Sequence, residues 1–177
     1  RHGVLGRVSL GSVGQTLLNS STVPVALSPR GMRHAPLDGL SRITVMLGES
    51  GRWRGVLSKA RTFADRAGVP LRLVTVATGD SQDTAEIEKR TEALLAEVRL
   101  DLTGLDDQRV QIVHAHSMSA AVLAMEWSRN ELAFLGSARL AQSGRLFLGP
   151  DANKILRVLP VPLVAVPADP ADVGGGT

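Results

Sequence analysis

The chain has 177 residues, enough for one ordinary domain and an additional segment. It contains no cysteine, which excludes disulfides, thiolate catalysis and Cys-ligated metal centres. Its net charge of +3 comes from residues 1–42, where five arginines face Asp38 alone, so the remainder is almost neutral. No basic run is interleaved with aromatic residues, which argues against nucleic-acid binding. No apolar run approaches the ~20 residues of a membrane-spanning helix, so we expect no direct membrane insertion.

The first elements in chain order are a helix over residues 11–20 and a strand at Val23–Leu27. Residues 30–42 contain proline and glycine without hydrophobic periodicity, which predicts a linker. A strand follows at residues 43–47, and then a helix that Gly68 ends. The predicted apolar face of that helix recurs at helical spacing and consists of Val56, Ala60, Phe63, Ala64 and Ala67.

The same alternation of strands and helices continues to residue 166. Residues 71–77 read as a strand, followed by a long helix that Asp83 or Thr84 caps. After a strand at 110–115, Ser117 or Ser119 caps a helix that is predicted to carry Trp127. Trp53 is likewise expected on a helix. Strands at 132–135 and 161–166 flank a glycine-containing loop and a helix that follows Gly149.

Strands alternating with helices at this spacing predict an α/β fold, a five-stranded parallel sheet with helices on both faces. The low aromatic content of 3% agrees with a core of Val, Leu, Ile and Ala. Ligands of such sheets bind where strands end and helices begin, because free backbone N–H groups and the helix dipole point there.

An internal repeat links the two ends of the chain. A shift of 138 residues places Gly6 on Gly144, Gly11 on Gly149, and Pro24 on Pro162. The matched glycines and the strand-opening proline indicate that residues 1–29 are the last helix and strand of a preceding repeat. We therefore expect the natural protein to extend upstream of this sequence.

The repeated residues carry a family resemblance. Gly136-x2-Arg139-x9-Gly149-Pro150 resembles the phosphate-binding signature G-x2-G-x9-G-[ST] of universal stress protein domains, which precedes a helix and a V-P-V strand. The resemblance implies a Rossmann-like, adenine nucleotide alpha hydrolase-like fold with strand order 3-2-1-4-5. It assigns 43–167 to a complete domain, and the tail 168–177 is expected to be disordered.

The resemblance also implies cofactor-binding positions, namely Gly136 and Gly149 in the complete repeat and Gly11 and Ser12 in the partial one. Three departures argue against ATP in the complete repeat. Arg139 replaces the second glycine, Pro150 replaces the hydroxyl residue, and Gly48 stands where the family carries an aspartate that reads the base or ribose. We therefore expect no cofactor, with ATP held through the Arg139 guanidinium as the alternative.

Other chemistry is weakly represented. His114-Ala-His116 places two imidazoles at one strand end, but no third ligand is evident, so no metal site is predicted. Gly6 and Gly11 are spaced as in a P-loop, yet the lysine that reaches the phosphates is absent. No motif pairs a nucleophile with its base, and we expect no catalytic activity.

The resulting expectation is a cytoplasmic, non-catalytic regulatory or stress-response module of the universal stress protein type. Two alternatives are the cytosolic regulatory domain of a membrane antiporter and an ATP-binding stress protein with unconventional phosphate contacts. The resemblance also implies a dimer, because the last strand of such domains is an edge strand. We expect Val161–Val166 to pair with Val23–Leu27 or with another chain.

Overall fold

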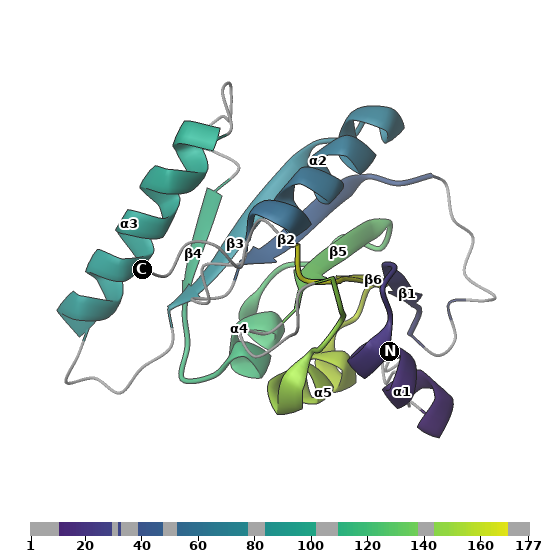
Figure 1. The fold of residues 1–177 in the computed structure, drawn as a ribbon. Coiled ribbons are helices and arrows are strands. Elements are labelled where there is room, and N and C mark those ends of the chain that lie inside the picture. The colour runs from purple at the N-terminus through teal and green to yellow at the C-terminus, as the bar shows by residue number, and fades with distance from the viewer. Residues whose placement is uncertain are drawn as a thin grey trace, which may run out of the picture.

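The computed structural model describes residues 11–29, 32, 39–47, 53–77, 84–101, 110–137 and 144–169. Within these residues the helices are α1 (Ser12–Ser20), α2 (Arg54–Ala67), α3 (Thr84–Asp101), α4 (Met118–Ala124) and α5 (Gly149–Val158). The strands are β1 (Val25–Leu27), β2 (Arg42–Leu47), β3 (Leu71–Ala77), β4 (Val110–His114), β5 (Glu131–Gly136) and β6 (Leu163–Val166). Figure 1 shows these elements as one sheet with helices on both sides.

The sheet has six strands in the order β1-β6-β5-β2-β3-β4. The five strands from β2 to β6 are parallel, and β2 lies between β3 and β5. This arrangement confirms the expected α/β fold. If the parallel strands β2 to β6 are counted as 1 to 5, their order is the expected 3-2-1-4-5. The sixth strand is β1, which pairs antiparallel with β6, so that Val25 lies opposite Ala165.

Burial along β2 shows how the sheet is covered on both faces. Its residues from Ile43 to Leu47 are all buried, because successive side chains point to opposite faces and both faces are packed. Ile43 and Val45 join the core cluster that includes α2, whereas Met46 joins the cluster that includes α5.

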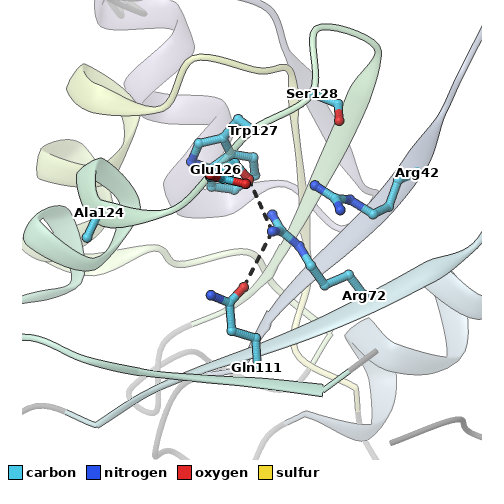
Figure 2. Close-up of a pocket in the computed structure, with 7 residues that line it drawn as sticks. All are labelled: Arg42, Arg72, Gln111, Ala124, Glu126, Trp127 and Ser128. Carbon is cyan, nitrogen blue, oxygen red and sulfur yellow. Dashed lines mark hydrogen bonds between the residues drawn. The ribbon is translucent and has the colours of Figure 1, made fainter. Parts of the chain in front are cut away.

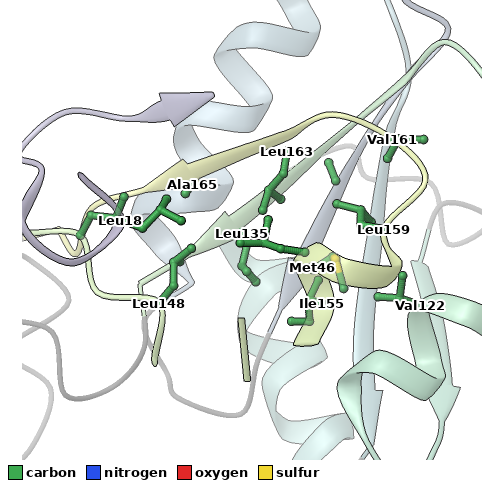
Figure 3. Packing of buried hydrophobic residues seen from close by; sticks show 13 residues of the cluster. Leu18, Met46, Val122, Leu135, Leu148, Ile155, Leu159, Val161, Leu163 and Ala165 are labelled. Atoms are coloured by element: carbon green, nitrogen blue, oxygen red, sulfur yellow. The ribbon is translucent and has the colours of Figure 1, made fainter. Parts of the chain in front are cut away.

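The cluster on the α5 side also contains a residue from α1. Leu18 belongs to the same buried cluster as Leu148, Ile155 and Ala165, and Figure 3 shows these side chains together. The backbone N–H of Leu146 donates to the carbonyl of Ser21 at 2.7 Å. The amino-terminal segment therefore shares both the sheet and the core of the remaining chain.

The predicted apolar face of α2 is partly wrong. Val56, Ala60 and Ala64 are buried as expected, but Phe63 is 47% exposed and Ala67 lies at the surface. Leu57 is buried in place of Phe63, which means that the packed face is rotated toward the Leu57 side. The Phe63 ring still contacts the Phe134 ring, with centroids 5.9 Å apart. Gly68 ends the helix at φ +64, as predicted.

Neither tryptophan lies within a helix, which corrects the sequence prediction. Trp53 directly precedes α2. α4 ends at Ala124, and Trp127 lies in the segment that follows. The indole N–H of Trp127 donates to the Val122 carbonyl at 2.9 Å, which folds the segment back against α4. The apolar pattern of α4 extends beyond Ala124 in the sequence because Met125 and Trp127 pack on the same core as the helix.

Candidate functional site at the carboxyl ends of the strands

The sequence-predicted glycines lie where parallel sheets bind ligands. Gly136 is the last residue of β5, and Gly149 is the first residue of α5. β5 lies next to β2. From β5 the chain continues to β6, toward one edge of the sheet, and from β2 it continues to β3, toward the other edge. This is the topological switch point at which doubly wound sheets form their binding crevice.

Ser137, directly after β5, connects three segments at this edge. Its buried hydroxyl donates to the Val166 carbonyl at 3.0 Å and contacts the Arg145 carbonyl at 3.2 Å. It also accepts a hydrogen bond from the Phe147 backbone N–H at 3.2 Å. A hydroxyl with these partners stabilises the loop, and it is not free to contact a phosphate.

Gly144 fixes the path of the chain toward α5. Its φ of +72 lies in the left-handed region, which costs residues with a Cβ about 1–2 kcal/mol. Its N–H donates to the Ala168 carbonyl at 2.9 Å, and the Ala168 N–H donates to the Arg145 carbonyl at 3.1 Å. The segment before α5 is thus hydrogen-bonded to the segment after β6.

The start of α5 lacks one backbone hydrogen-bond donor. Leu148 occupies the cap position, and no side chain caps the helix. Pro150 lies in the first turn, where it favours helix formation but lacks the N–H that other residues would supply. The helix dipole still attracts an anion here, although one of the usual backbone donors is missing.

The matching positions near the amino terminus begin a different helix. Gly11 is the cap residue of α1, in extended backbone, and Ser12 is the first helical residue. Both residues are exposed, and the Ser12 carbonyl accepts from the Thr16 hydroxyl at 3.0 Å. Gly11 and Ser12 thus belong to α1, whereas Gly136 and Gly149 belong to β5 and α5.

Several predicted positions cannot be placed. Gly48, Arg139, the first ten residues and residues 170–177 of the expected disordered tail lie outside the described residues. His114 and His116 are both exposed at the end of β4. Among the described residues, no group of three or more His, Asp or Glu side chains could hold a metal ion. None of the helices placed by the structure is long and apolar enough to cross a membrane.

The sequence analysis did not predict a polar cluster at the amino-terminal ends of the strands, opposite the ends that carry the glycine signature. Glu131, the first residue of β5, is buried and forms ion pairs with Arg42 of β2 and Arg72 of β3. The available signal was a charged residue at or near the start of each of three apolar strands. Only the strand order shows that these three charges meet.

Comparison with known proteins agrees with the fold. No family model matches the sequence. A universal stress protein from Mycobacterium tuberculosis, Rv2319c, is 31% identical over 174 residues, covering 91% of this chain. The chain spans only 59% of that relative's length.

Two solved structures show the same architecture. A universal stress protein from Archaeoglobus fulgidus superposes with a TM-score of 0.57 at 24% identity, covering 92% of this chain and 56% of the other. A Pseudomonas aeruginosa UCBPP-PA14 protein described as a candidate universal stress protein gives a TM-score of 0.61 at 16% identity, with 93% and 59% coverage. The sequence relationship and the shared fold establish that this chain belongs to the universal stress protein family.

Proposed function

We propose that this chain is a non-catalytic regulatory or stress-response module whose complete repeat, residues 43–167, binds ATP no better than millimolar. The observation that carries the proposal is Pro150 in the first turn of α5. At this place the signature of ATP-binding relatives has a serine or threonine. Proline supplies neither the side-chain hydroxyl nor the backbone N–H that would face a phosphate.

The expected loss of affinity follows from the missing donors. Hydrogen bonds to a charged group contribute roughly 1.5–3 kcal/mol each. Loss of two such bonds weakens a micromolar site by about two to four powers of ten. The nearby hydroxyl of Ser137 does not replace them, because it already bonds to backbone groups of Val166 and Phe147. Partial recovery through the Arg139 charge is limited to about 1 kcal/mol if that side chain is exposed to salt.

Calorimetric titration of ATP into the chain tests the proposal. We expect no binding tighter than millimolar for the natural sequence, and a gain of at least about tenfold for the Arg139→Gly, Pro150→Ser double variant. Micromolar binding by the natural sequence would refute the proposal and favour phosphate contacts through Arg139. An unchanged double variant would assign the loss to the base-reading position, Gly48.

A cytoplasmic location and the absence of catalysis are parts of the same proposal. The antiporter alternative depends on sequence beyond this chain, and no arrangement among the described residues favours it. A full-length reading frame would distinguish the two, because the antiporter alternative requires many additional hydrophobic spans.

A further inference from the structure

A pocket of about 560 Å³ opens at the amino-terminal edge of the sheet, opposite the edge that carries the glycine signature. Arg42, Arg72 and Gln111 reach it from the starts of β2, β3 and β4. Trp127 and Ser128, from the segment between α4 and β5, line its other side. Figure 2 shows the two guanidinium groups and Gln111 facing this segment.

The Glu131 carboxylate, which pairs with both arginines, already accepts hydrogen bonds at all of its acceptor positions. Glu131 Oε2 accepts from Arg42 Nη2 at 2.6 Å and from the Ser128 N–H at 3.0 Å. Its Oε1 accepts from Arg72 Nη2 at 2.7 Å and from the Thr44 hydroxyl. The Glu131 side chain is fully buried, so these four donors account for its hydrogen bonding.

Two guanidinium groups therefore share a single buried carboxylate, which leaves one positive charge in excess. Glu126 also lines the pocket, but its residue is exposed, so water and salt screen its carboxylate. Burial lowers the pKa of Arg72, and the neighbouring charge of Arg42 lowers it further, while Glu131 raises it. An anion in the pocket would compensate the excess charge that these two arginines bring together.

The two arginines differ in how fully their donors are used. Arg72 donates to Thr44 Oγ1 at 2.9 Å, to the Glu126 carbonyl at 3.1 Å and to Glu131, and it stacks on the Trp127 ring at 5.2 Å. Among the described residues Arg42 is held at Nη2 only, and its Nε is buried without a partner, so Nη1 and the second N–H of Nη2 are the donors left for a ligand. With its side chain 30% exposed, Arg42 presents a fixed but incompletely bonded guanidinium to the pocket.

We propose that this pocket binds a small oxyanion, a carboxylate or a phosphate group, through the Arg42 guanidinium. The planar fork of arginine matches such oxyanions, and Glu131 and Arg72 hold the surroundings of that fork in place. The exposed Gln111 amide and Ser128 hydroxyl supply further polar contacts beside the Trp127 ring. The site lies at the opposite edge from Gly149, so it is independent of the ATP proposal.

Titration of the chain with sodium acetate and, separately, with sodium phosphate at constant ionic strength tests the proposal. The chain has two tryptophans, and each indole N–H group gives one NMR signal. We expect a saturable shift of the Trp127 signal with at least one anion, and no shift of Trp53, which contributes to another core cluster. The anion that saturates identifies the ligand class. Absence of saturation with both anions, or equal shifts of both signals, would overturn the proposal.

Variants separate a specific site from a general charge effect. Arg42→Gln should weaken anion binding at least about tenfold. Because this change also removes a partner of Glu131, Arg42→Lys serves as a second variant that keeps the charge but loses the fork, and it should bind more weakly than the natural chain. Arg61→Gln removes the same charge from the exposed surface of α2 and should bind normally. Equal affinity of both Arg42 variants and the natural chain would contradict the proposal.

Discussion

At the scale of single residues, Glu131 is a fully buried carboxylate that accepts four hydrogen bonds. It begins a strand whose other residues are apolar, and it is enclosed by Arg42, Arg72 and Thr44. A buried ion pair adds little stability compared with an apolar replacement, because desolvation offsets its Coulomb energy. Removal of one partner is costly, however, since it leaves a buried charge without compensation.

We therefore predict that Glu131→Gln destabilises the fold by about 3–5 kcal/mol, because two arginines would face a neutral amide. Urea unfolding followed by circular dichroism measures this loss. Glu86→Gln is the matched control, since it breaks the exposed pair with Arg90 and should cost less than about 1 kcal/mol. Equal losses in the two variants would show that the Glu131 cluster has no special role in stability.

At the scale of elements, β1 covers one edge of the sheet. β6 would be an edge strand without it, and exposed edges pair readily with other chains. Here β1 pairs with β6 inside the same chain, with Leu27 opposite Leu163. The other edge strand, β4, carries the exposed residues Gln111, Ile112 and His114. Self-association with a second chain thus stays a prediction, and it depends on whether β1 can be displaced.

Ala26→Pro should release β1 and promote self-association through the uncovered β6. Ala26 is an exposed residue in the middle of the strand, and proline there removes the backbone N–H and fixes φ near about −65°, far from the roughly −140° of an antiparallel strand. Analytical ultracentrifugation should show a larger dimer fraction than for the natural chain at equal concentration. Ala26→Thr is the control, because threonine suits an exposed strand position and should leave association unchanged. An unaltered distribution in Ala26→Pro would mean that β6 is not the associating edge.

At the scale of the whole molecule, the amino-terminal segment with α1 and β1 packs with the remaining described elements as one unit. Leu18 of α1 is buried in the same cluster as Leu156 and Leu163, and β1 belongs to the same sheet. α1 nevertheless exposes Val13 and Leu17, which are 72% and 46% accessible. The amino-terminal segment is thus attached through Leu18, whereas Val13 and Leu17 are open to solvent.

We expect one cooperative thermal transition for the chain. Shared core and shared sheet mean that the amino-terminal segment cannot open without exposing Leu18 and the β6 edge. Scanning calorimetry should give equal calorimetric and van't Hoff enthalpies. As an internal comparison, Leu18→Ala should lower the midpoint of the whole transition, because a buried leucine is truncated. Two separate transitions, with Leu18→Ala affecting only the first, would contradict this expectation.

Much of the fold could be predicted from local signals. Alternating strands and helices, the Gly68 helix end and the Ser117 cap depend on residues close together in the sequence. The glycine signature likewise placed Gly136 at a strand end and Gly149 at a helix start. These predictions succeeded because hydrophobic periodicity and turn chemistry are properties of short segments.

The order and type of most elements follow from local sequence patterns, but which distant residues meet depends on how the strands pair and the helices pack. Phe63 fits the helical pattern of α2, yet the packing angle of that helix leaves it half exposed. Arg42 and Arg72 lie 89 and 59 residues before Glu131, and no local pattern relates them. They meet because β2 pairs with β3 on one side and β5 on the other, which aligns the amino ends of all three strands. Burial then makes each charge depend on the others, since a lone charge there would lose its hydration without compensation.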